Sequence, residues 1–291
     1  MSSAFDQLGD DPGHDDLFTP VSEKRLAHVW LLYGGQGTGK TYTSMTFPEP
    51  IFVIDTELRS DLTARGEFDD RDIRIFEPGA ISFENVDPSD PLEDAIDIPQ
   101  SLDNVNNAVI TLVNGYREGD IEGGTVVLDS VTDLWDWTQE WGKQRLMQQG
   151  DVNEADFRLE NQFDWGMIKS KHYKILTGLR SLAKQYGAEV VFTAREKQIP
   201  DYAEGGGEHY IKCENSVPFW TEINGRFIRD VHKGQTRHMV DFKKIGPNNQ
   251  PNERLINPTY EDMVEVLETG EVKSEEEQIE SEEDGDEDDG F

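Results

Sequence analysis

The sequence predicts an α/β fold with a mostly parallel central sheet flanked by helices. Short apolar runs typical of buried strands alternate with segments that have helical periodicity. Parallel strands covered by helices on both faces are apolar almost throughout, and their alternation with helices is typical of βαβ units. The predicted strands are His28–Tyr33, Ile51–Ile54, Thr125–Leu128 and Glu189–Phe192.

The segments between and after these strands are predicted in chain order. Residues 77–99 are acidic and aperiodic, so we expect an insertion loop. A helix follows from an N-cap at Ser101, and the most regular helix spans Trp165–Tyr186. Residues 197–218 form a glycine-containing loop at the edge where α/β sheets bind ligands. Two late strands follow, over Glu222–Val231 and Gln235–Phe242, joined by a turn at Lys233–Gly234.

The two ends of the chain differ from the core in composition. Residues 1–25 are polar and rich in Asp, Gly and Pro, which predicts a disordered lead-in to a folded domain over residues 26–246. Residues 247–270 form a C-terminal extension in which we expect order to fade, apart from a short helix near Tyr260–Leu267. Residues 271–291 form an acidic tail that we expect to be disordered.

Acidic residues exceed basic ones throughout the 291-residue chain, with 60 Asp and Glu against 27 Lys and Arg and a formal net charge of −33. The tail holds 12 acids and one lysine, so the rest of the chain still carries −22 (−33 + 11). Such a surface repels itself unless salt screens it, which predicts a salt-adapted organism or a virus of one. This balance also disfavours broad nucleic-acid affinity.

The composition makes several cellular settings unexpected. No run approaches the roughly 18 apolar residues of a membrane span, and the first residues do not resemble a secretion signal, so we expect a cytoplasmic protein without membrane contact. Cys213 is the sole cysteine, which excludes an internal disulfide and fits a reducing compartment.

A glycine-rich phosphate-binding motif follows the first predicted strand. The residues match G-x-x-x-x-G-K-[ST], with a strand before and a helix-compatible segment after. Glycines let the backbone N–H groups wrap closely around a phosphate. Lys40 is expected to neutralise the β- and γ-phosphates, and the Thr41 hydroxyl to bind Mg²⁺. The predicted nucleotide-binding residues are Gly34, Gly35, Gln36, Gly37, Thr38, Gly39, Lys40 and Thr41.

Two carboxylates complete the predicted site. The strand Thr125–Leu128 carries Asp129 to the carboxyl end of the sheet, where it is expected to hold Mg²⁺, with capping of the next helix as the alternative. Asp55 and Glu57 end the second strand, and Glu57 is the predicted catalytic group that polarises the attacking water. The alternative for Glu57 is a surface acid in an acid-rich protein.

These motifs resemble the ATPase core of RecA and archaeal RadA. The order of first strand, glycine loop, Ile54-Asp55-Thr56-Glu57 and Val126–Ser130 carries the resemblance. The segment Phe47–Glu57, with Asp164–Gly166 and Phe192–Glu196, is similar to the short RecA-like nucleotide-binding (AAA-type) proteins of tailed viruses. Together with the acid excess, this resemblance implies a virus of a halophilic archaeal host. The resemblance covers residues 28–245 and implies ATP and Mg²⁺ as ligands and ATP hydrolysis as the activity.

The resemblance also implies roles for residues outside the two main motifs. The strand ending in Phe192 would lead to a γ-phosphate sensor, where RecA proteins carry Asn-Gln and this chain has Ala194-Arg195. Arg195 would act as that sensor or clamp the γ-phosphate directly. The following loop would face single-stranded DNA through cations and stacking rings, although it also contains four acids. Its candidate DNA-binding residues are Lys197, Tyr202, Tyr210 and Lys212.

Two more features bear on partners. Lys243 and Lys244 resemble the RecA basic pair that reaches the ATP of a neighbouring subunit, which implies a homo-oligomer; the alternative is a solvated basic edge. The tail ends in Phe291 and resembles the acidic, aromatic-ended tails that recruit protein partners, with a merely solubilising tail as the alternative.

The function predicted from the sequence is ATP-driven DNA recombination, single-strand annealing or replication. A viral DNA-packaging or motor ATPase is one alternative. A nucleotide-dependent regulatory switch without DNA binding is the other.

Overall fold

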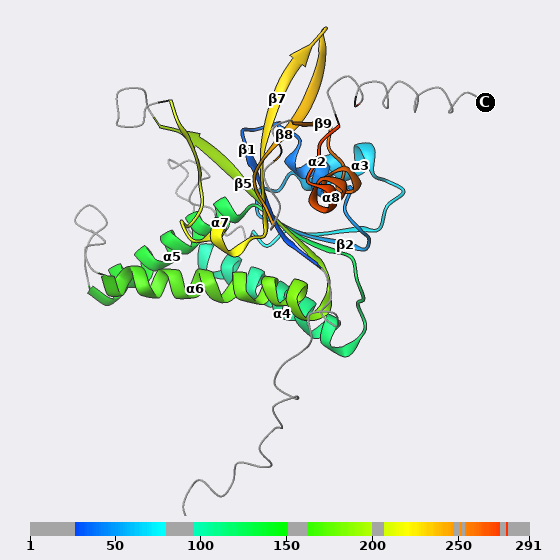
Figure 1. Ribbon diagram of the computed structural model, residues 1–291. Helices are drawn as coiled ribbons and strands as arrows, with labels where there is room; N and C mark the ends of the chain where they lie inside the picture. The colour runs from blue at the N-terminus through cyan, green and yellow to red at the C-terminus, as the bar shows by residue number, and fades with distance from the viewer. Residues whose placement is uncertain are drawn as a thin grey trace, which may run out of the picture.

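The computed structural model describes residues 27–79, 96–150, 162–199, 207–246, 251, 254–273 and 278. Within these residues a nine-stranded sheet carries helices on both faces (Figure 1), which confirms the predicted α/β class. The predicted disordered lead-in (1–25), most of the insertion and nearly all of the acidic tail with Phe291 lie outside the described residues.

The sheet is mostly parallel. Its strand order is β3-β2-β4-β5-β1-β7-β8-β9, and β6 pairs with β5. The six strands from β3 to β7 in this order run parallel to one another. Strands β6, β8 and β9 pair with their neighbours in the antiparallel direction. The strands are β1 (Val29–Gly34), β2 (Ile51–Asp55), β3 (Ile73–Phe76), β4 (Thr125–Asp129), β5 (Glu189–Gln198), β6 (His209–Ile211), β7 (Ile223–His232), β8 (Gln235–Ile245) and β9 (Leu255–Ile256).

The sheet separates two layers of helices, and an apolar core lies between the sheet and each layer. On one face, buried side chains of α4, α5, α6 and η4 pack against the sheet. On the other face, α8 packs over Trp30 and Phe47, and α2, α3 and α8 lie together in Figure 1. The helices are α2 (Lys40–Ser44), α3 (Ser60–Glu67), α4 (Ile98–Glu118), α5 (Val131–Gly150), α6 (Gln162–Ser181), the π-helical turn η4 (Leu182–Tyr186), α7 (Val217–Trp220) and α8 (Tyr260–Thr269).

The strand register brings the ends of four strands to one edge of the sheet. Gly34 at the end of β1 lies opposite Arg195 of β5, and Asp55 at the end of β2 lies opposite Asp129 of β4. Carboxyl ends of parallel strands are the usual ligand-binding edge of such sheets. The register therefore places the glycine loop and the predicted carboxylates side by side.

The start of α4 differs from the prediction. Asp97 caps this helix by accepting a hydrogen bond from the Gln100 N–H at 3.0 Å, so the predicted cap at Ser101 is wrong. Ser101 instead lies inside the helix and its hydroxyl donates to the Asp97 carbonyl at 2.7 Å. The expected insertion 77–99 consequently ends earlier, because the helix already includes residues 98 and 99. Pro at the second helical position fits this earlier start.

The C-terminal extension packs onto the core. Beyond Gly246, where we expected order to fade apart from one helix, β9 also pairs with β8. The helix forms as α8 and is closed by a capping box, in which Thr259 and Asp262 bond to each other's backbone N–H groups. Met263 and Val266 of this helix are buried against the sheet. None of the helices in the described ranges is long and apolar enough to cross a membrane.

Candidate nucleotide site

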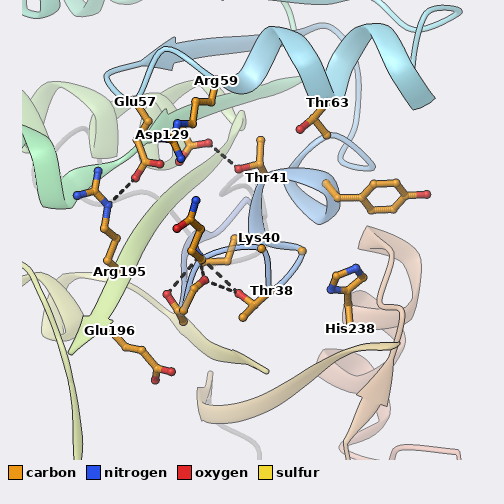
Figure 2. Close-up of a pocket in the computed structure, with 16 residues that line it drawn as sticks. Thr38, Lys40, Thr41, Glu57, Arg59, Thr63, Asp129, Arg195, Glu196 and His238 are labelled. Atoms are coloured by element: carbon orange, nitrogen blue, oxygen red, sulfur yellow. Dashed lines mark hydrogen bonds and ion pairs between the residues drawn. The ribbon is translucent and has the colours of Figure 1, made fainter. Parts of the chain in front are cut away.

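A cavity of about 720 Å³ lies at the carboxyl edge of the sheet. The whole predicted loop from Gly34 to Thr41 lines it, together with Glu57, Asp129 and Arg195. Figure 2 shows Lys40 in the middle of this space, with Glu57 and Arg195 on one side and His238 on the other. The structure therefore brings the predicted loop and all three predicted partners from other strands into one cavity.

Close backbone contacts explain why the loop needs its glycines. A Cβ on Gly34 would lie 2.3 Å from the carbonyl oxygen of Phe227 on the neighbouring strand β7. Gly37 and Gly39 have φ values of +67° and +94°, which residues other than glycine rarely adopt. The Thr38 hydroxyl donates to the Gly35 carbonyl at 2.9 Å and tightens the turn. The loop thus needs glycine at position 34 for space and at positions 37 and 39 for backbone conformation.

The Lys40 ammonium group folds back over the loop. Its Nζ donates to the carbonyl oxygens of Gly35 at 2.7 Å and Gly34 at 3.2 Å. Burial lowers the pKa of this ammonium group, and the negative charge of Asp129 opposes the change. A cation held over a glycine turn suits an anionic phosphate better than a neutral ligand.

Asp129 points toward the loop, and three hydroxyl groups surround its carboxylate. The Thr41 hydroxyl donates to Oδ2 at 2.7 Å, the Ser60 hydroxyl donates to the same oxygen at 3.3 Å, and the Thr193 hydroxyl donates to Oδ1. Burial raises the pKa of Asp129, whereas the hydrogen bonds from Thr193 and Thr41 lower it. Capping of α5, the alternative role for Asp129, falls instead to Ser130, whose hydroxyl accepts from the Asp133 N–H at 3.3 Å.

The Thr41 and Asp129 pair fits a magnesium ion. Mg²⁺ prefers hydroxyl and carboxylate oxygens and usually keeps several waters while it binds substrate phosphates. No group of three or more His, Cys, Asp or Glu side chains in the described part of the chain is arranged to hold a metal ion by itself. A metal at this edge would therefore take its remaining ligands from water and from the phosphates of a bound nucleotide.

The two acids after β2 have different environments. Asp55 is fully buried, and its carboxylate accepts from the N–H groups of Glu57, Arg59 and Ser60 at 3.0, 2.8 and 2.7 Å. This carboxylate shapes the turn into α3, so Asp55 does not point into the cavity. Glu57 lines the cavity, and its Oε1 accepts from Arg195 Nε at 3.0 Å.

Arg195 links Glu57 to a further acid, Asp133 of α5. The Arg195 Nη2 atom lies 2.7 Å from the Asp133 carboxylate. Burial raises the pKa of Asp133 to about 6, and the positive charge of Arg195 opposes this rise. The sequence analysis did not predict a role for Asp133, because its position beside Arg195 depends on the packing of α5 against β5.

The predicted DNA-facing residues lie on the hairpin of β5 and β6. Lys197 pairs with Tyr210 across this hairpin, and both are exposed. Lys212 is held by an ion pair with Asp136 at 2.5 Å, whereas Tyr202 lies outside the described residues. None of the three described residues lines the nucleotide cavity.

The predicted trans-acting lysines lie away from this cavity. Lys244 pairs with Asn224 near the start of β7, at the opposite end of the strand from the loop, and donates to the carbonyls of Pro218 and Thr221. Lys243 lies 3.7 Å from the Asp241 carboxylate. Within one chain these lysines therefore contribute nothing to the nucleotide site, and a role at a neighbouring subunit stays a prediction.

Five further residues line the cavity: Tyr42, Arg59, Thr63, Glu196 and His238. Tyr42 directly follows the motif, and Glu196 directly follows Arg195, so a wider window around each predicted residue would have included both. His238 comes from β8 and has no local signal in the sequence.

The comparisons agree with this geometry. A family model described as an AAA domain matches residues 27–244, about three quarters of the chain. No curated protein matches the chain.

Proposed function

Because this chain belongs to the AAA-domain family of P-loop ATPases, we propose that it binds ATP with Mg²⁺ and hydrolyses the nucleotide at the cavity of β1, β4 and β5. One observation carries the proposal: the Lys40 ammonium group, the Thr41–Asp129 pair and the Glu57–Arg195 pair converge on a single cavity. Phosphoryl transfer to water needs these three elements, which are charge neutralisation, metal binding and orientation of the nucleophile.

Each group has a distinct task in this proposal. Lys40 exchanges its contacts with the loop carbonyls for phosphate oxygens. Thr41 and Asp129 would hold a Mg²⁺ ion, which would supply neutralisation of the phosphate charge. Glu57 orients the attacking water and accepts its proton. Arg195 holds the Glu57 carboxylate at the edge of the cavity and is itself held by Asp133.

Two variants test the hydrolytic site against a matched control. Lys40→Ala is expected to lose nucleotide binding, measured by calorimetry with Mg·ATP in molar salt. Glu57→Gln is expected to bind ATP normally and to lose turnover by about 100-fold or more, a typical effect for a general base. Glu118→Gln alters an exposed acid of α4 outside the cavity and should behave as wild type. Normal turnover by Glu57→Gln would remove the role of Glu57, and normal affinity of Lys40→Ala would remove that of the loop.

We further propose that the ATPase acts on single-stranded DNA as a RecA-like recombination, annealing or replication factor, and works as a homo-oligomer. The hairpins β5–β6 and β7–β8 extend beyond the edge that carries the nucleotide loop (Figure 1), which supports this proposal. Lys197 and Tyr210 supply an exposed cation beside an exposed ring on the first hairpin, and the exposed Arg229 and Lys233 lie on the second. Cations and aromatic rings together suit single-stranded nucleic acid.

The ATPase rate with and without single-stranded DNA tests this second step. Molar salt is the appropriate condition, since the acid excess indicates a protein of a salt-adapted virus or organism. Stimulation that is reduced in a Lys197→Ala, Tyr210→Ala double variant supports the proposal. A rate indifferent to DNA would overturn it and favour a regulatory switch, and a rate that depends on a capsid protein would favour a packaging motor.

A further inference from the structure

The cavity has two chemically different ends. Glu57, Arg195 and Asp129 gather at one end, and His238 and Thr63 lie at the other, with Lys40 between them (Figure 2). This inference rests on the proposed function, in which the terminal phosphate faces Glu57 and the phosphate chain passes over Lys40. The nucleoside of the substrate is then left with the end formed by His238 and its neighbours.

His238 is held rigidly beside the loop. Its backbone N–H donates to the Asn257 side-chain oxygen at 3.0 Å, and its carbonyl oxygen accepts from the Asn257 N–H at 2.6 Å. A Cβ on Gly39 would lie 2.9 Å from Cγ of the His238 ring, so the ring packs directly against the glycine loop. The backbone bonds anchor this position of β8, and the packing against Gly39 limits the movement of the ring, so a ligand binds it with little further loss of conformational entropy.

The imidazole offers the cavity an aromatic ring and not its Nδ1 atom. Nδ1 is buried against the glycine loop and has no hydrogen-bond partner among the described residues, so a ligand in the cavity does not reach it. His238 nevertheless lines the cavity. Aromatic rings pack favourably on one another in offset-stacked or edge-to-face arrangements, which suits the flat base of a nucleoside.

Tyr42 adds an aromatic surface to the same cavity. It follows Thr41 directly, and its side chain is 42% exposed although it is large and aromatic. The Tyr42 ring packs on one side against Phe68, with 4.9 Å between the ring centroids. This contact steadies the ring and leaves part of its surface open to a flat ligand.

We propose that His238 and Tyr42 form the nucleoside-binding end of the site, where their two rings supply aromatic surfaces for the base of the nucleoside triphosphate. Neither residue touches the reacting phosphate, so both contribute to affinity and base selectivity and not to the chemical step.

Inorganic tripolyphosphate separates this role from general support of the loop, because it carries the phosphates without a nucleoside. Calorimetry with Mg²⁺ compares ATP and tripolyphosphate binding to wild type, His238→Ala and Tyr42→Ala. We expect each variant to weaken ATP binding about tenfold, a loss of about 1.4 kcal/mol, and to change tripolyphosphate binding less than about twofold. His232→Ala, on the same hairpin but outside the cavity, is the matched control.

Each outcome bears on one of the two proposals. Equal losses for ATP and tripolyphosphate would mean that His238 only supports the loop, and unchanged ATP affinity would also overturn the inference. If wild type binds neither compound, the proposed function fails instead. His238→Leu keeps a bulky side chain against Gly39 and removes the aromatic ring, so it answers the question even if His238→Ala does not fold: ATP affinity equal to wild type would refute the role of the ring.

Discussion

His172 is a buried histidine whose neutral form the fold requires, and this predicts a measurable loss of stability at mildly acidic pH. Its side chain on α6 has no exposed surface, and its ring packs edge-on against Trp135 of α5 at 5.0 Å. Neither ring nitrogen has a hydrogen-bond partner among the described residues. Burial lowers the pKa of His172 from 6.5 to about 4, and the negative charge of Glu214 opposes that change.

The pKa difference sets the size and the direction of the effect. As the pH falls below 6.5, the unfolded chain takes up a proton that the folded protein accepts only near pH 4. The folded state is therefore disfavoured progressively across this window. At about 1.36 kcal/mol per pH unit the full effect is about 3 kcal/mol, and at pH 5 it is about 2 kcal/mol. Asp133, with a pKa raised to about 6 by burial, contributes with the opposite sign, because its folded form binds a proton more readily.

Urea unfolding of wild type and His172→Phe at pH 7.5 and pH 5 in constant high salt isolates the contribution of this one residue. The variant should lose about 2 kcal/mol less than wild type between the two pH values. At pH 7.5 the two should differ by about 1 kcal/mol or less, since the substitution removes a buried polar group and keeps the ring. His172→Leu guards against overpacking by Phe, and His232→Gln should keep the wild-type difference. Equal losses in wild type and both His172 variants would refute the reasoning.

The remaining predictions concern the nucleotide site. Thr193→Val removes a hydrogen bond that lowers the pKa of Asp129, so the pH below which ATPase activity is lost should move upward, whereas Thr193→Ser should keep the wild-type pH profile of kcat/KM. Gly34→Ala places a Cβ 2.3 Å from the Phe227 carbonyl oxygen and should destabilise the protein by about 2 kcal/mol or more and abolish ATP binding. Gly66→Ala, in a helix with open space around the added Cβ, should be neutral or stabilising by about 1 kcal/mol, and urea unfolding measures the stability change of both glycine variants.

The parallel core of the sheet was predictable because its strands are continuous apolar runs. A short run of apolar residues on both faces is typical of a buried parallel strand. The predicted strands Ile51–Ile54 and Thr125–Leu128 lie inside β2 and β4. The edge strand β3 was missed because it is half exposed and carries Arg74, so it lacks that signal. The start of α4 was misplaced because Ser101 is a good cap by residue type, whereas Asp97 makes the actual capping bond.

The glycine-loop end of the cavity was predictable for a different reason. Eight consecutive residues supply the loop, so their spacing in the sequence is also their spacing in space. Asp129 ends β4 and Glu57 follows the end of β2 by two residues, so both were predictable at the carboxyl edge that parallel strands share. Asp55 is the last residue of β2, yet only the backbone of the following turn decides that Asp55 faces inward and Glu57 faces the cavity.

The position of His238 at the proposed nucleoside end depends on two strand registers that no local pattern specifies. Gly34 lies opposite Phe227 in the pairing of β1 with β7, and Phe227 lies opposite Val240 in the pairing of β7 with β8. His238 precedes Val240 by two residues, so it lies on the same face of the sheet and one step closer to the edge with the glycine loop. A shift of one residue in either pairing would turn the imidazole to the opposite face. The pairing of the strands therefore determines that His238 reaches the cavity, and the sequence around His238 does not indicate this.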